Sequence, residues 1–112
     1  MFKRGGIYSV NLAPEGNGTP ETCPCVVVSN NISNEFSPVV TIIPLSFRNL
    51  EKIYEFETFL PAAKTGLAAD AKLSSHIIIT TDKAKVVGER LGFLSKTLME
   101  QVEKALRFQL EL

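Results

Sequence analysis

The stretch TCPCVVVSNN, residues 22–31, decides the predicted fold, because it runs from a loop end through a valine-rich segment into a polar turn. Residues 25–29 have the composition of a buried strand, and a second run rich in valine and isoleucine follows at residues 39–45. The segment NNISNEFSP between these runs is polar and predicts a turn. We therefore expect residues 25–29 and 39–45 to form two central strands of an antiparallel sheet.

The flanking segments add three more predicted strands. Residues 7–12 and 53–60 alternate between apolar and polar side chains, and residues 76–80 form a short apolar run. Residues 13–24 hold three prolines and two glycines and predict a loop, longer than the usual ~4–6 residues and therefore a candidate functional segment. A turn is predicted at residues 62–70, and a connector with at most a short helical turn at residues 81–92.

The C-terminal segment predicts a helix over residues 96–110, with Ser95 as its N-cap. Its apolar residues recur at helical spacing: Leu98, Met99, Val102, Ala105, Leu106 and Leu110. Five strands followed by one amphipathic helix predict a mainly β protein with an α addition. We expect one domain, residues 1–112, built as a small closed antiparallel barrel with a C-terminal helix.

Composition limits the function classes. No apolar run approaches the ~18 residues of a membrane span, and the N-terminal sequence lacks a secretory signal, so we expect a soluble, cytoplasmic protein without a membrane partner. Twelve basic against twelve acidic residues give zero formal charge, which excludes the broad basic surface of a duplex-DNA binder. Any contact with nucleic acid must therefore be local.

The cysteines are the other unusual feature. Only Pro24 separates Cys23 from Cys25, so a disulfide between them would be strained, and we expect reduced thiols. Together with the single histidine, His76, they fall short of the usual four-ligand metal sites, so no metal and no cofactor is expected. Cys25 is expected only to fill the core.

These features together carry a resemblance. The segment KRGGIYSVNLAPEGNGTPETCPCVVVSNN, residues 3–31, resembles the opening of the MazF/PemK toxins, which combine an Arg-Gly-acidic-aliphatic-Tyr start, a Gly-rich loop, and Arg-Pro before a run of valines leading to Asn. The match continues through NEFSPVVTIIPLS, ITTDKAKV and LMEQVEKAL and so covers nearly the whole chain. The resemblance implies an SH3-like barrel of the CcdB/PemK type. It also implies a homodimer, cleavage of single-stranded RNA, neutralisation by a small antitoxin peptide, and binding of operator DNA only together with that antitoxin.

The chemistry that the resemblance implies is metal-independent attack of a ribose 2′-hydroxyl on the adjacent phosphate. Such a step needs a proton acceptor, a proton donor and groups that stabilise negative charge on the phosphate. The family's arginine and threonine for these roles align here with Cys23 and Ser46. A thiol carries no positive charge in any state, so the replacement predicts weakened catalysis.

Two residues could compensate for the missing arginine. Arg48 shares a strand face with Ser46 if the strand continues, although an exposed arginine beyond the strand end is the commoner arrangement. His76 aligns where the family has an acidic residue facing the RNA groove, although a lone histidine is more often structural. Ile79 replaces an arginine that the family commonly carries before Thr80, which removes a phosphate-binding charge.

The candidate RNA-binding residues are Gly16, Gly18 and Thr19 in the loop, and Thr80. Gly18 stands where the family usually has an acidic residue. Three functions remain open: a toxin endoribonuclease, a catalytically weakened relative that binds an antitoxin or nucleic acid, and an SH3-like interaction module unrelated to toxins.

Overall fold

The structure is a computed structural model that describes residues 2–14, 16 and 18–112. Met1 and two residues of the predicted loop, Glu15 and Asn17, lie outside the described residues. The strands are β1 (Gly6–Asn11), β2 (Thr22–Val27), β3 (Val39–Ser46), β4 (Glu57–Leu60), β5 (Ala71–Ser74), β6 (Ile79–Asp82) and β7 (Val86–Phe93). The helices are α1 (Asn31–Phe36), α2 (Ala62–Thr65) and α3 (Lys96–Leu110), with a 3-10 turn, η1 (Lys83–Lys85), between β6 and β7.

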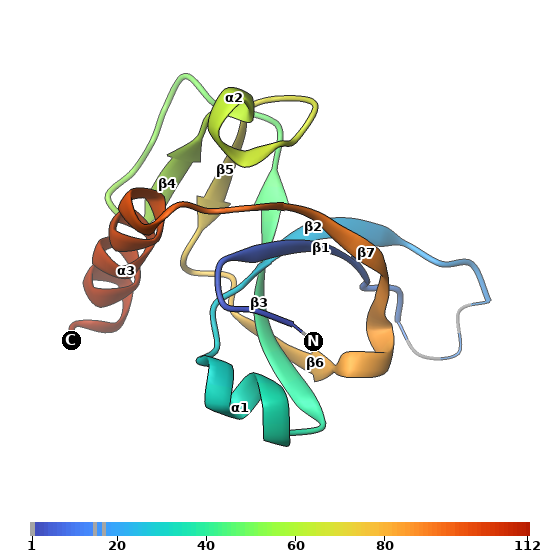
Figure 1. Cartoon of the computed structure of the whole chain (residues 1–112). Helices are drawn as coiled ribbons and strands as arrows, with labels where there is room; N and C mark the ends of the chain where they lie inside the picture. Colours follow the sequence, from blue (N-terminus) through green and yellow to red (C-terminus); the bar gives the residue numbers. More distant parts are fainter. Residues whose placement is uncertain (1, 15, 17) are drawn as a thin grey trace.

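The strands form one antiparallel sheet in the order β4-β5-β3-β2-β1-β7, with β6 paired to β3 as a branch (Figure 1). The long strand β3 pairs with β2, β5 and β6. Its first half pairs with β6 and its last two residues pair with β5, while β2 lies along its other edge. The mainly β fold with a C-terminal helix is thus confirmed.

The closed barrel that we expected is wrong. The sheet curves strongly, but among the described residues β7 pairs with β1 and β6 pairs with β3, without the β6–β7 ladder that closure requires. The turn η1 joins these two strands directly and carries the chain around the corner between them (Figure 1). The sheet is therefore open at the β6–β7 corner.

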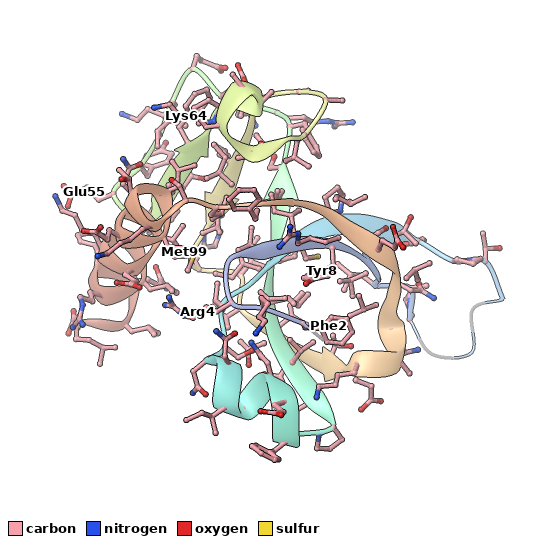
Figure 2. All side chains as sticks on the ribbon, viewed as in Figure 1. Phe2, Arg4, Tyr8, Glu55, Lys64 and Met99 are labelled. Carbon is pink, nitrogen blue, oxygen red and sulfur yellow. The ribbon has the colours of Figure 1, made fainter. Side chains whose placement is uncertain are left out.

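Strict alternation along β3 creates two separate cores. Ile43 and Leu45 face the outer core, which α3 covers with Leu98, Met99 and Val102. Val40 and Ile42 face the inner core, enclosed by the curved sheet and shared with Tyr8, Val10, Cys25 and Val27. Figure 2 shows Phe2 and Tyr8 together inside this curve, where their rings meet edge to face with centroids 5.2 Å apart.

The C-terminal helix has the predicted bounds, residues 96–110. Ser95 caps it as expected, because its Oγ accepts the N–H of Leu98 at 3.2 Å. Leu98 and Val102 are buried against the outer core, and Leu106 packs partly against it. The helical periodicity of the sequence was therefore sufficient to place this element.

Several strand predictions were wrong. The sheet has seven strands rather than five, because β7 lies in the predicted connector and β5 lies at residues 71–74, where no element is predicted. The predicted strand 53–60 is a strand only from Glu57, and the predicted strand 76–80 is displaced to 79–82. The predicted turn between residues 30 and 38 contains α1, which Asn30 caps by accepting the N–H of Ser33.

Gly92 in β7 lies against the end of α2. A β-carbon at this position would collide with the carbonyl oxygen of Thr65 at the end of α2. We predict that Gly92→Ala lowers the free energy of unfolding by about 1–3 kcal/mol, the usual cost of overpacking. Urea unfolding measures it, with Gly18→Ala, where a β-carbon meets open space, as the control. Equal stability of the two variants would contradict the packing of α2 on β7.

Candidate functional site

Most of the candidate residues lie at the end of the sheet where β2 begins and β3 ends, which we call the Cys23–Ser46 edge. Strand β2 begins where the antiparallel strand β3 ends, and the register of the two strands pairs Cys25 with Pro44. Beyond this pair, Cys23 packs partly against the inner core, and its thiol lies close to the carbonyl oxygen of Leu45, the residue before Ser46. The thiol and the hydroxyl that the resemblance singles out are therefore neighbours across two strands.

Cys23 is half-buried at the rim of the inner core, and Cys25 is completely buried within it. The Cys23 thiol lies 3.8 Å from the carbonyl oxygen of Leu45, and the Cys25 thiol donates to the carbonyl of Cys23 at 3.3 Å. A hydrogen bond from the Cys25 side chain, against the opposing effect of burial, lowers the pKa of Cys23 to about 7. The same hydrogen bond, together with burial, raises the pKa of Cys25.

We predict selective alkylation of Cys23. Iodoacetamide should modify one thiol per native chain, with a rate that rises as the pH passes through about 7, because the thiolate is the reacting form. Mass spectrometry of peptides gives the site, and Cys25 should react only after unfolding. In the Cys25→Ala variant the midpoint should move up toward the ordinary value of ~8.5, since the hydrogen bond is lost. Equal reaction of both native thiols would contradict this geometry.

The Ser46 hydroxyl is engaged by the turn that follows β3. Its Oγ accepts the N–H of Arg48 at 3.3 Å and lies 3.5 Å from the carbonyl oxygen of the same residue. This contact brings the Arg48 backbone against the hydroxyl, while the Arg48 side chain is exposed. The structure thus brings Ser46 and the Arg48 backbone together, with the Arg48 side chain in solvent.

The glycine-containing loop leaves the sheet at the same edge (Figure 1). Its base is fixed because Asn11 Oδ1 accepts the N–H groups of Ala13 and Glu21 at 3.0 and 3.2 Å. Gly16, Gly18 and Thr19 are exposed, and Gly16 has a φ of 84°, which glycine adopts readily. Cys23 follows the base by two residues, so the loop projects from beside the thiol.

A buried ion pair holds the segment between Ser46 and β4. The Lys72 ammonium lies 3.2 Å from Glu57 Oε2 and donates to the carbonyls of Asn49 and Lys52 at 3.0 and 3.3 Å. Burial raises the pKa of Glu57, but hydrogen bonds from Ser74, the Tyr54 N–H and Lys72 outweigh it and hold that pKa below its usual value. Sequence reasoning missed Lys72, since nothing in its spacing distinguishes it from a surface lysine.

The remaining candidates lie on β6 and in the segment that precedes it. Thr80 faces away from the inner core, with its Oγ1 3.3 Å from that of Thr41, so it lies on the opposite face of β3 from Ser46. Ile79 packs against the inner core. His76 is exposed in the irregular segment between β5 and β6, where its ring meets Phe56 edge to face with centroids 4.9 Å apart.

Two other kinds of site are absent from the part of the chain that the structure describes. No group of three histidine, cysteine or acidic side chains is placed to hold a metal ion. Across the same residues, no helix combines the length and apolar character that crossing a bilayer requires.

Known proteins are similar to this chain in sequence and in fold. The endoribonuclease MazF9 of Mycobacterium tuberculosis is 31% identical over 118 aligned positions, covering 100% of this chain and 98% of that protein. A mycobacterial endoribonuclease in complex with its cognate antitoxin superposes with a TM-score of 0.79 at 23% identity, covering 100% of this chain and 97% of that one. MazF in the MazE-MazF complex of Deinococcus radiodurans gives 0.79 at 22% identity, over 98% and 96% of the two chains.

The curved antiparallel sheet with its C-terminal helix is therefore the fold of the small toxins of toxin-antitoxin systems. The family assignment rests on sequence as well as fold. Residues 3–110 match the PemK-like, MazF-like toxins of type II toxin-antitoxin systems, and the chain belongs to that family.

Proposed function

We propose that this toxin binds single-stranded RNA at the sheet edge carrying Cys23 and Ser46, and cleaves it slowly. The observation that supports the proposal is the 3.8 Å distance between the Cys23 thiol and the carbonyl oxygen of Leu45, the residue before Ser46, beside the base of the projecting loop. Relatives of the chain are endoribonucleases, and Cys23 and Ser46 offer a proton acceptor and a hydrogen-bond donor, two of the groups that attack by a 2′-hydroxyl requires. The family assignment argues against an interaction module unrelated to toxins.

The chemistry of the edge explains why cleavage should be slow. Because its pKa is about 7, Cys23 is partly thiolate at neutral pH, and the thiolate can accept the 2′-hydroxyl proton and become the thiol. Ser46 can donate to a phosphate oxygen once its hydroxyl turns from the Arg48 backbone. Neither group supplies positive charge to the phosphate, and Arg48 and His76 are the cationic candidates that could replace it.

The test is a single-turnover assay on a long unstructured RNA, with EDTA present to exclude metal-dependent contaminants. We expect slow cutting that leaves 2′,3′-cyclic phosphate ends, and its loss in Ser46→Ala. Ser37→Ala, a matched change far from the edge, should keep the wild-type rate. Rapid cutting by the unmodified protein would show that Arg48 or His76 already replaces the missing charge, and alanine variants of the two residues would identify which.

We also propose the partners that the family implies: a cognate antitoxin peptide, a second copy of this chain, and operator DNA bound only with the antitoxin. Relatives have been solved as complexes with their antitoxins. Exposed apolar side chains on the free edge strand β7, including Val87, Leu91 and Phe93, support self-association. Light scattering at micromolar concentration should give twice the chain mass of 12.3 kDa, and a monomer would contradict the homodimer.

A second candidate function follows from the thiol itself. Because Cys23 rests against the Leu45 carbonyl and carries no positive charge, the edge could bind RNA or an antitoxin without cutting. Binding of an antitoxin-like peptide by a protein that leaves RNA intact, in both the unmodified and the Cys23→Arg forms, would favour this function over the endoribonuclease.

A further inference from the structure

An exposed stack of rings lies outside the edge described above. Tyr54 and Phe56 are parallel, with centroids 5.3 Å apart and 6° between their planes. His76 adds an edge-to-face contact on Phe56, and the Lys52 ammonium lies 5.1 Å from the centre of the Tyr54 ring. Tyr54 is 50% exposed, so the stack lies at the surface rather than in a core, and a base that stacks on the Tyr54 face under Lys52 would displace that ammonium.

The backbone beneath these rings is fixed. Glu57 accepts the N–H of Tyr54 at 3.1 Å and donates its own N–H to the Tyr54 carbonyl at 2.9 Å. The Phe56 carbonyl accepts the N–H of Ser75 at 2.8 Å, and Lys72 holds the Lys52 carbonyl. The rings are therefore held in place before any ligand arrives, so binding would cost little ordering entropy.

The charges around the stack favour a flat neutral ligand over a phosphate. Lys52 is the cation at the rings, and the neighbouring Glu51 and Glu55 are exposed acidic residues that would repel a dense phosphate backbone. Figure 2 shows Glu55 projecting outward from this side of the molecule. Aromatic faces bind unpaired nucleobases by stacking whatever the base, because every base has a π-face.

The stack also lies within a short distance of Ser46. Ser46 pairs with Lys72, and both side chains lie on the same face. His76 follows Lys72 by four residues, at most about 13 Å along the chain at ~3.3 Å per residue. A strand of RNA engaged at Ser46 would reach the rings within a short binding site of ~4–16 nucleotides.

We propose that Tyr54, Phe56 and His76 form a stacking subsite for one unpaired nucleobase of the RNA bound at the Cys23–Ser46 edge. This inference rests on the proposed function and adds to it a place where the substrate is held away from the reacting phosphate. The subsite binds the base by its face, and its contribution to affinity is independent of the charge at position 23.

The test measures binding rather than cleavage. Fluorescence anisotropy with a labelled, unstructured single-stranded RNA compares the unmodified protein with Tyr54→Leu, Tyr54→Phe and Lys52→Gln over a range of salt concentrations. We expect Tyr54→Leu to weaken binding about 5- to 100-fold, the loss of one stacked base, without changing the salt dependence. Tyr54→Phe should retain the affinity. Phe36→Leu on α1, an exposed aromatic residue remote from the stack, is the matched control, and urea unfolding shows that the variants are folded.

The outcomes separate this inference from the proposed function. If the protein cuts RNA and Tyr54→Leu binds RNA as tightly as the unmodified protein, the subsite is wrong and the function stands. If Tyr54→Leu and Lys52→Gln both flatten the salt dependence, the contact is to phosphate and the base subsite is also wrong. If the unmodified protein neither binds nor cuts RNA, both the function and the subsite are overturned.

Discussion

Cys23→Arg is expected to raise the rate of single-stranded RNA cleavage by about 10²–10³-fold, the effect of one preorganised donor to a transition-state oxyanion. The guanidinium would extend from the start of β2 along the face that Ser46 shares. It supplies a permanent charge and up to five N–H donors, none of which the thiol provides. Single-turnover rates on the same unstructured RNA measure the effect.

The control variants isolate the charge from the loss of the thiol. Cys23→Met, which is neutral and similar in length, should stay at or below the wild-type rate. Adding Ser46→Ala to Cys23→Arg should remove most of the gain, because both groups act on one phosphate. A rate for Cys23→Arg no higher than that of Cys23→Met, in a protein that still cuts RNA, would show that position 23 does not face the scissile phosphate.

Lys72→Met is expected to lower the free energy of unfolding by about 3–5 kcal/mol, the cost of removing one partner from a buried ion pair. The Glu57 and Lys72 side chains are only 5% and 9% exposed, so the carboxylate would remain buried without its charge partner. The carbonyls of Asn49 and Lys52 would also lose their donor, which loosens the segment that follows Ser46. Urea unfolding at neutral pH measures the loss, and Lys64→Met on the exposed surface of α2 is the control.

The pH dependence of the free energy of unfolding is a second test of the Glu57–Lys72 pair. Because the folded-state pKa of Glu57 is depressed, its contribution to stability is present above the unfolded value of ~4.3 and is lost as the pH falls through the folded value. In Lys72→Met the buried carboxylate gains from protonation, so the difference from wild type should narrow between pH 7 and pH 4. A constant difference over this range would mean that Lys72 acts by packing alone.

The sequence predicted the secondary structure correctly where a long segment follows a single periodicity. The helix at residues 96–110 follows from its cap and its apolar spacing, and the valine-rich runs identified β2 and β3 as central strands. The segment Val86–Phe93 was missed because Gly88, Glu89, Arg90 and Gly92 interrupt the apolar pattern. It is nevertheless a strand, because its backbone forms hydrogen bonds with β1, and the pattern of its side chains does not predict this pairing.

The candidate site was predictable only in part. The resemblance selected Cys23 and Ser46, and the thiol of Cys23 lies close to the carbonyl oxygen of Leu45, the residue before Ser46. Thr80 was selected by alignment alone, and side-chain alternation turns it to the other face of β3. Local sequence does not predict contacts between distant segments, such as those of Lys72 with residues 49–52. It does not predict the lowered pKa of Cys23 either, because that pKa depends on the folded surroundings of the thiol.

Protection of Cys23 by RNA tests most directly whether the Cys23–Ser46 edge is the RNA site. The rate of Cys23 alkylation by iodoacetamide is measured near pH 7 with and without saturating unstructured single-stranded RNA, in a protein whose RNA binding has been established by anisotropy. We predict that bound RNA slows alkylation at least several-fold, while double-stranded DNA at the same concentration leaves the rate unchanged. An unchanged Cys23 rate in the RNA complex would contradict the account, because it would place the RNA on another surface.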